Sequence, residues 1–546
     1  FEPLELSGFA PSGLPVSLSL DFAPEPGTAL RMVTNTGLDP IAGTFANLVQ
    51  GQLVSLPHEG VIYPFVVNYH GGTGNDLVLE WANTRVMAWG LGNSGQLGTG
   101  DRNSRVVPTR VSEAGILRGK TIIATAAGPD DSFVLCSDGT LALWGNNNNG
   151  NLMVPAEVAR TGALAGRTVV AIATGYRHKL VLCADGSLVS WGSNDVGQLG
   201  VPTTEAQPVP VLVDRSGVLA GRTVVAIACG RDYSMVLLDD GTLAAWGHNE
   251  FGQLGDGTGA DSGRPVLVDR SGVLAGRTVT DFACGATHVL ALCSDGTLAA
   301  WGYNEFGQLG DNSTINRTRP VLPRAGATAG KTITAIAAGT SHSLAYCADG
   351  TLAAWGRNSS GQLGNGTGTN SRVPVAVDQS GVLADWSIVK IDAGASFCLV
   401  QAEDGALAAW GDGNYGQLGN GTGNNSSRPV AVLSGDIKES DRILTIDSGS
   451  QHNLLRVASP PPAFVETLAA TDILDTGGTL VASINPNGNN DVAISFEFGL
   501  TEDYGLTLPG DPATITDGQA AVATAQVGDL QPGVTYHYRA VVRSEA

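Results

Sequence analysis

Charged residues are scarce in this sequence, and positive charge is the scarcer kind. Asp, Glu, Lys and Arg make up 15% of its 546 residues, where about a quarter is usual. The 30 Lys and Arg are outnumbered by 51 Asp and Glu, so the formal net charge is −21. Such an acidic chain repels phosphate backbones and anionic lipid surfaces. The sequence therefore predicts no nucleic-acid partner.

Long apolar runs are also missing. No stretch reaches the ~18 consecutive apolar residues that a membrane-spanning helix needs, so we expect no membrane insertion. No signal peptide is visible, and the sequence begins at Phe1 rather than at Met. This beginning suggests that the start of the chain is processed or trimmed.

Glycine is abundant, and it belongs to a repeat. The chain has 74 Gly, about twice the usual share, and the dipeptide Trp-Gly recurs at intervals of 47–55 residues. The seven tryptophans concerned are Trp89, Trp144, Trp191, Trp246, Trp301, Trp355 and Trp410. A fixed period near 50 made of short strands is typical of a β-propeller. The sequence predicts an all-β protein with a seven-bladed propeller over residues 85–457.

A second motif makes the repeat specific. Gly-Gln-Leu-Gly follows six of the Trp-Gly pairs, at residues 95–98, 197–200, 252–255, 307–310, 361–364 and 416–419. The repeat resembles that of the regulator of chromosome condensation family, which implies a seven-bladed propeller. The second copy departs from the pattern, because Gly150-Asn151-Leu152-Met153 replaces the tetrapeptide. We expect a shortened loop in that blade.

The two ends of the array complement each other. The first Trp-Gly strand, at residues 86–90, has no strand pair before it, whereas the last strand pair, at residues 446–455, has no Trp-Gly strand after it. We predict that the strand around Trp89 pairs with Leu454–Val457 in one shared blade. Such closure removes exposed sheet edges.

Both flanks of the propeller also have strand patterns. Residues 1–84 form a β-rich segment that resembles strands of bacterial surface and autotransporter-like proteins. Within it, residues 71–79 fit a calcium-binding nonapeptide, which makes Asp76 a weak candidate for a calcium ligand beside the alternative of a Gly-rich hairpin turn. Calcium is the one cofactor left open.

A proline linker at residues 458–462 precedes a further domain at residues 463–546. Its stretch at residues 530–539 resembles a late strand of fibronectin type III domains, in which a tyrosine hydroxyl commonly pins the corner. A β-sandwich of this kind would have one more strand, so the domain is expected to be incomplete.

The residues that could do chemistry recur in repeat register, which favours structural roles. The Asp-Gly pairs are expected to be hairpin turns, and four histidines at one repeat position are expected to bond a local backbone group: His178, His288, His342 and His452. Six of the seven cysteines share repeat positions in separate blades, too far apart for disulfides, and all seven are expected to be buried. We expect no carboxylates to gather outside the Asp-Gly turns, and no catalytic site.

The function predicted is that of a non-enzymatic bacterial scaffold for adhesion, assembly or display, secreted or held at the cell surface. Its partners would be other protein chains, including copies of itself, with carbohydrate left open. The alternative is a specific protein-binding propeller, since the resemblance includes a secreted inhibitor of enzymes. A polysaccharide-active enzyme and a GTPase exchange factor are less favoured.

Fibre formation by strand sharing is a further expectation, beside the alternative that this sequence ends early and the next residues complete the sandwich. Residues 14–22 alternate apolar and polar side chains, as a half-buried strand does, and they precede any recognised domain. An incomplete terminal sandwich would offer the open edge that such a strand needs. The apolar positions are Leu14, Val16, Leu18, Leu20 and Phe22.

Overall fold

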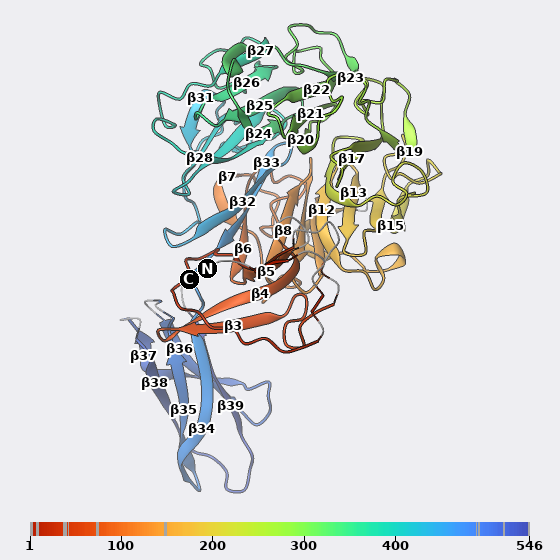
Figure 1. The fold of residues 1–546 in the computed structure, drawn as a ribbon. Helices are drawn as coiled ribbons and strands as arrows, with labels where there is room; N and C mark the ends of the chain where they lie inside the picture. The colour runs from red at the N-terminus through yellow and green to blue at the C-terminus, as the bar shows by residue number, and fades with distance from the viewer. Residues whose placement is uncertain are drawn as a thin grey trace.

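The computed structural model is almost entirely β-structure and contains seven four-stranded sheets arranged as a ring, with a smaller sheet and a sandwich below it (Figure 1). It describes residues 4–6, 10–11, 13–35, 41, 43–71, 76–146, 150–487, 489, 492–516 and 519–543. The predicted all-β class, with a seven-bladed propeller, an N-terminal β-segment and a C-terminal sandwich, is confirmed. Among the described residues, no helix is both long enough and apolar enough to cross a bilayer.

Each of the first six blades is a meander of four antiparallel strands. Blade 1 contains β8 (Ile122–Ala127), β9 (Asp131–Cys136), β10 (Leu141–Asn146) and β11 (Asn151–Glu157); blade 2 contains β12 (Val169–Thr174), β13 (His178–Cys183), β14 (Leu188–Gly192) and β15 (Gln207–Leu212). Blade 3 contains β16 (Val224–Cys229), β17 (Tyr233–Leu238), β18 (Leu243–Gly247) and β19 (Ser262–Leu267); blade 4 contains β20 (Val279–Cys284), β21 (His288–Cys293), β22 (Leu298–Gly302) and β23 (Arg317–Val321). Blade 5 contains β24 (Ile333–Ala338), β25 (His342–Cys347), β26 (Leu352–Gly356) and β27 (Ser371–Ala376); blade 6 contains β28 (Ile388–Ala393), β29 (Phe397–Ala402), β30 (Leu407–Gly411) and β31 (Ser426–Ala431). Two 3-10 turns, η1 (Gly162–Leu164) and η2 (Gly326–Thr328), lie between blades.

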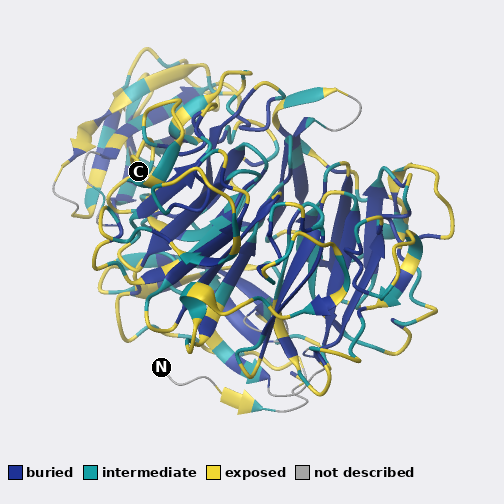
Figure 2. Ribbon diagram, turned by 90° about the horizontal axis from the view of Figure 1, so that it is seen from above, coloured by how far each residue is buried: buried dark blue, intermediate teal, exposed yellow. Residues whose placement is uncertain are grey.

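The middle strands of each blade are buried on both faces because every sheet is stacked between two neighbours. All five residues of β22, Leu-Ala-Ala-Trp-Gly, are buried, whereas the fourth strand β19 has exposed positions. Figure 2 shows the buried strands inside and the exposed loops around the rim. The Asp-Gly pairs are hairpin turns as predicted: in each, the Asp carboxylate accepts a hydrogen bond from the backbone N–H two residues on.

The two ends of the array close the ring in blade 7. This blade contains β32 (Arg442–Ser448), β33 (His452–Ala458), β6 (Thr84–Gly90) and β7 (Arg105–Arg110). Strand β33 pairs antiparallel with β6, so that Leu454 lies opposite Ala88 and Leu455 opposite Met87. The predicted pairing of the Trp89 strand with Leu454–Val457 is confirmed.

A recurring hydrogen bond joins one blade to the next. In six of the seven junctions, a tryptophan indole N–H donates to the backbone carbonyl of the glutamine in the preceding blade's Gly-Gln-Leu-Gly turn, over 2.8–3.0 Å. The pairs are Trp89 with Gln417, Trp144 with Gln96, Trp246 with Gln198, Trp301 with Gln253, Trp355 with Gln308, and Trp410 with Gln362. The two sequence motifs are thus the donor and the acceptor of one inter-blade bond.

The four repeat-equivalent histidines reinforce these junctions. His178 Nε2 lies 3.0 Å from Ser234 Oγ in the next blade, and Ser234 Oγ donates to the Gln198 carbonyl over 2.9 Å. His288, His342 and His452 reach across in the same way, to Ser343, Cys398 and Ser132. Burial lowers the pKa of all four rings, to about 3 or about 4, so they are neutral. The expectation of a local backbone partner was wrong, because blade stacking brings a distant side chain closer.

The flanking domains pack on one another and on the ring. The N-terminal sheet contains β1 (Leu4–Leu6), β2 (Leu30–Asn35), β3 (Leu53–His58), β4 (Val61–Gly71) and β5 (Asp76–Trp81); the C-terminal sandwich contains β34 (Phe464–Leu474), β35 (Gly477–Asn485), β36 (Val492–Gly499), β37 (Leu506–Ile515), β38 (Ala521–Val527) and β39 (His537–Arg543). The Trp81 indole donates to the Ser459 carbonyl over 2.8 Å. Ile62 N–H donates to Asn487 Oδ1 over 3.1 Å. The N-terminal sheet therefore lies between the propeller and the sandwich (Figure 1).

The sandwich contains the tyrosine bond expected from the sequence. The Tyr536 hydroxyl accepts a hydrogen bond from the backbone N–H of Gln531 over 3.1 Å, as a corner-pinning tyrosine does. Strand β39 pairs with β36 on one side and forms one edge of the sheet. Assignment of this domain to the fibronectin type III family stays a prediction.

Replacing Ser234 by Ala tests the inter-blade bond. The change removes the acceptor of His178 and one donor to Gln198, and a buried polar group left without a partner costs about 1–3 kcal/mol. We expect the free energy of unfolding of the propeller to fall by that amount in urea denaturation. Ser216→Ala, at an exposed turn, is the control and should change it by less than about 0.5 kcal/mol. Equal effects of the two substitutions would contradict the assignment.

Candidate functional site

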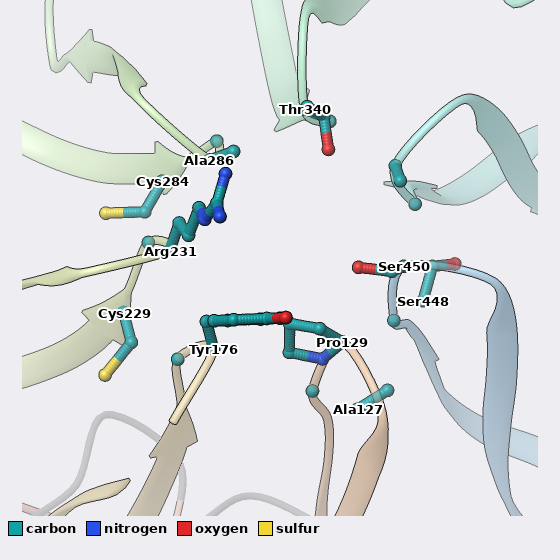
Figure 3. A pocket seen from close by; sticks show the side chains of 18 of the residues that line it. Ala127, Pro129, Tyr176, Cys229, Arg231, Cys284, Ala286, Thr340, Ser448 and Ser450 are labelled. Carbon is teal, nitrogen blue, oxygen red and sulfur yellow. The ribbon is translucent and has the colours of Figure 1, made fainter. Parts of the chain in front are cut away.

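The first strand of every blade ends at a glycine, and together these seven turns surround the mouth of the central channel. The glycines are Gly128, Gly175, Gly230, Gly285, Gly339, Gly394 and Gly449. They and their neighbours line a cavity of about 370 Å³ (Figure 3). All seven blades contribute to this cavity, so it forms only when the ring is complete.

Glycine is required in these turns by close packing. A Cβ on Gly339 would lie 2.3 Å from Cε1 of His342 and 2.4 Å from the carbonyl oxygen of Gly394. A Cβ on Gly230 would lie 1.9 Å from the Tyr233 ring. Real Cβ atoms do not approach other atoms so closely. In six of the seven turns the aromatic ring three residues on fills the place that a side chain would take, and at Gly128 the Asp131 carboxylate does so. The mouth is therefore lined largely by backbone.

Backbone hydrogen bonds run around the mouth from blade to blade. Tyr176 N–H donates to the Arg231 carbonyl over 2.8 Å, and Arg231 N–H donates to the Ala286 carbonyl over 3.1 Å. On the other side, Thr340 N–H donates to the Ala395 carbonyl over 3.2 Å. Because these bonds fix the backbone of the rim, the positions from which its side chains extend are set before any ligand binds.

The largest side chains at the mouth come from blades 2 and 3. Arg231 and Arg177 each place the guanidinium carbon 5.1 Å from the centroid of the Tyr176 ring. Figure 3 shows Tyr176 and Arg231 on one side of the cavity and Thr340 and Ser450 on the other. Tyrosine and arginine are the residue types that most often carry binding energy in protein interfaces. The mouth therefore presents an aromatic and cationic edge on a chain whose net charge is strongly negative.

Two carboxylates lie in adjacent blades directly below the mouth. Asp392 accepts a hydrogen bond from Ser448 N–H over 2.6 Å, and Asp447 accepts one from the Thr125 hydroxyl. Burial raises the pKa of Asp392 to about 6 and that of Asp447 to about 7. The expectation that carboxylates would not gather outside the Asp-Gly turns was therefore wrong.

A signal for these carboxylates is present in the repeat. Aligned on the glycine of the turn, Asp392 and Asp447 occupy the position that is Ala173 in β12 and Ala228 in β16. An acid replacing alanine in the first strand of a blade must face a neighbouring blade or the channel. Both aspartates lie two residues before the glycine of the mouth, so this departure could have identified them.

The calcium candidate Asp76 lies apart from this site, in the N-terminal sheet. Its carboxylate is buried, accepts a hydrogen bond from Asn35 N–H over 2.9 Å and lies 3.5 Å from the Arg31 guanidinium. Protein donors on β2 thus engage the side chain, which ties β5 to β2. Residues 72–75 of the proposed nonapeptide lie outside the described residues. No cluster of His, Cys, Asp or Glu suited to a metal occurs in the part of the chain that the structure describes.

The strand-sharing segment also lies away from the mouth, on its own N-terminal domain. Residues 14–22 form no strand. Val16 exchanges two hydrogen bonds with the Asn47 side chain, over 2.8 and 2.6 Å, and Val16, Leu18 and Leu20 pack against the core of the N-terminal sheet, whereas Leu14 and Phe22 stay exposed. The segment was expected to be free to reach another chain, whereas three of its five apolar side chains are half-buried against its own sheet; strand sharing with another chain stays a prediction. The seven cysteines are free thiols; five are buried as expected, whereas Cys229 and Cys284 are half-buried.

Comparisons with known proteins point to one family. The profile described as "RCC1-like domain" matches residues 153–459, more than half of the chain, and that of the "Regulator of chromosome condensation (RCC1) repeat" matches residues 85–135. The Arabidopsis thaliana ultraviolet-B receptor UVR8 is 31% identical over 370 residues, which cover 68% of this chain and 70% of that protein. The human E3 ubiquitin-protein ligase HERC2 is 33% identical over 231 residues, 42% of this chain. The chain spans only 4% of the length of HERC2.

Solved structures agree at the level of the fold. Human WBSCR16 superposes with a TM-score of 0.59 at 23% identity and covers 69% of this chain and 99% of its own. Yeast RCC1 (Prp20), in its structure with Kap60, gives 0.59 at 22% identity and covers 69% of this chain and 89% of its own. At these identities the similarity shows the fold alone.

The channel carboxylates predict a pH dependence of stability. The pKa of Asp447 rises from 3.8 to about 7 on folding, so the folded protein keeps a proton that the unfolded chain releases. The free energy of unfolding therefore falls as the pH rises across that window. Asp447→Asn removes this penalty and keeps an oxygen acceptor for Thr125.

At pH 8 we expect Asp447→Asn to be more stable than the wild type by roughly 2–4 kcal/mol, given about 1.4 kcal/mol per pKa unit. At pH 4.5 the difference should shrink to about 1 kcal/mol, because an unfolded-chain carboxylate with a pKa of 3.8 is still mostly ionised there. Denaturation at both pH values measures this, and comparing the two proteins at each pH cancels the contribution of the buried histidines. A difference that does not change with pH would contradict the assignment.

Proposed function

The chain belongs to the RCC1-like domain family, and from that premise we propose that it is a non-enzymatic scaffold that binds other proteins through the channel-mouth face of its propeller. The observation that carries the proposal is the group formed by Tyr176, Arg177 and Arg231 on a rim fixed by backbone hydrogen bonds. A rigid aromatic and cationic group loses little conformational entropy when it meets a partner. It suits a partner surface that offers acidic and apolar side chains.

The two flanking domains support a role in display. They extend from one side of the propeller as a column, with the N-terminal sheet next to the ring and the sandwich beyond it (Figure 1). We propose that they hold the propeller away from an attachment point, outside the cell or at its surface. The resemblance of both flanks to extracellular modules supports this location, and the low Lys and Arg content is in keeping with it.

Affinity capture with matched variants tests the proposal. Tyr176→Ala combined with Arg231→Ala removes the aromatic and cationic edge, whereas Arg264→Ala removes an exposed arginine that pairs with Asp214 away from the mouth. Each immobilised protein is incubated with extracts and secreted material from its source, and recovered proteins are quantified by mass spectrometry. Residues at the centre of an interface each contribute about 2 kcal/mol or more, so partners should fall at least about tenfold with the mouth variant only.

Two results would overturn the proposal. One is recovery of the same partners by the mouth variant and the wild type, with equal melting temperatures showing that both are folded. The other is turnover of a polysaccharide in a reducing-sugar assay that Asp447→Asn abolishes, because the channel carboxylates would then be catalytic.

A further inference from the structure

The junction between blades 1 and 2 differs from the other six. Strand β10 turns back into β11 without a Gly-Gln-Leu-Gly turn, so that Gly145 pairs with Leu152 and Asn146 with Asn151. The shortened loop predicted for this blade is confirmed, with residues 147–149 outside the described part. No glutamine carbonyl is therefore supplied to the tryptophan of blade 2.

That tryptophan, Trp191, keeps its place without its usual hydrogen bond. Its ring packs edge-on against Phe133 in blade 1, with centroids 5.9 Å apart, and 8% of its surface is exposed. Among the described residues, its indole N–H has no hydrogen-bond partner, although the six equivalent indoles each have one. A donor that lines a groove and has no protein acceptor favours a ligand that brings a carbonyl oxygen.

The second bond of the junction is also replaced. At the positions of the histidine and serine stand Asp131 and Lys179, whose Oδ2 and Nζ lie 2.5 Å apart, with both side chains at least nine-tenths buried. Thr174 Oγ1 lies 3.2 Å from the other carboxylate oxygen of Asp131. This ion pair holds blades 1 and 2 together without the missing turn. The two blades are thus held together although no Gly-Gln-Leu-Gly turn packs against Trp191.

A groove of about 520 Å³ occupies that place. It is lined by Trp191, Gly192 and Lys179 from blade 2 and by Leu143 and Asp131 from blade 1. Its volume lies within the roughly 300–1,000 Å³ typical of ligand sites. Tyr176 lines both this groove and the channel mouth, so the two are neighbours on one face.

An exposed cationic side chain lies at the groove. Arg177 lines the groove and is exposed, with its guanidinium carbon 5.1 Å from the centroid of the Tyr176 ring. The carboxylates of Asp130, which also lines the groove, and of Asp232 interact with it electrostatically. Lys179, by contrast, is neutralised by Asp131. The exposed guanidinium of Arg177 thus favours an acidic group on whatever enters the groove, in competition with Asp130 beside it.

We propose that the groove between blades 1 and 2 binds an extended segment of a partner protein, which takes the place of the missing Gly-Gln-Leu-Gly turn. A backbone carbonyl of the segment accepts the Trp191 indole N–H, an apolar side chain enters the groove, and an acidic side chain pairs with Arg177. This inference rests on the proposed protein-binding function and names the chemistry of the partner. A second copy of this chain does not suit the groove, because its own Gly-Gln-Leu-Gly turns are buried in their junctions.

A peptide copied from the chain provides the probe. Residues 304–311, Asn-Glu-Phe-Gly-Gln-Leu-Gly-Asp, contain the turn and two acidic side chains. The fluorescein-labelled peptide is titrated with the full chain, and fluorescence anisotropy measures binding; a scrambled peptide is the control. We expect saturable binding of the native peptide alone, weakened about five- to tenfold by Trp191→Phe, since one hydrogen bond of about 1 kcal/mol is lost. Arg177→Ala should weaken it by a similar factor.

A blocking variant completes the test. Ala206→Trp places a bulky ring at the exposed lip of the groove and should abolish binding. Ala260→Trp makes the same change at an exposed position of the blade 3 loop, beside a junction that already holds its turn, and should leave binding unchanged. Binding that Ala206→Trp does not affect, or no preference for the native peptide, would overturn the inference.

The affinity-capture experiment, repeated with single variants, distinguishes this inference from the proposed function. Loss of partners with both Ala206→Trp and Arg231→Ala supports both. Loss with Arg231→Ala alone overturns the groove and leaves the mouth as the binding site. If neither variant loses partners, the proposed function itself fails, while the peptide titration still decides whether the groove accepts such a segment.

Discussion

The ring depends on one hydrogen bond, from a tryptophan indole N–H to a glutamine carbonyl of the preceding blade. Stacked sheets otherwise meet through apolar side chains, whose attraction is not directional. A buried donor and a buried acceptor that can satisfy each other in only one arrangement set the position of one blade against the next. Because Trp-Gly supplies the donor and Gly-Gln-Leu-Gly the acceptor, the two motifs must occur together. The histidine beside them adds a second bond to four of the seven junctions, to a serine in three and to Cys398 in the fourth.

A ring built in this way can have a different junction only if another bond replaces the lost one. The pair Asp131–Lys179 does so between blades 1 and 2. An isolated buried ion pair adds little stability beyond a well-packed apolar contact, because removing two charges from water offsets their attraction. What it provides here is a junction that holds without a turn and leaves Trp191 accessible. In a repeat protein the site-specific chemistry lies where the repeat is broken, since the regular positions are all engaged in the scaffold.

The sequence was sufficient for the features that depend on local spacing. The Trp-Gly period predicted seven blades, the unequal ends predicted that β33 pairs with β6, and the Asp-Gly pairs predicted hairpin turns. It did not show the partner of His178, because Ser234 lies 56 residues away and meets it only when two blades stack. The sequence likewise did not show that Asp392 and Asp447 lie near each other in adjacent blades. Inter-blade contacts depend on how the ring closes, which no single repeat contains.

Hydrogen exchange of the indole N–H groups tests this account most directly. Nuclear magnetic resonance of the protein with ¹⁵N-labelled tryptophan resolves each indole and measures its exchange with solvent deuterium. The account predicts slow exchange for Trp89, Trp144, Trp246, Trp301, Trp355 and Trp410, whose indoles bond to buried carbonyls, and much faster exchange for Trp191. Protection of Trp191 equal to that of the other six would contradict it, because the junction between blades 1 and 2 would then already hold its acceptor.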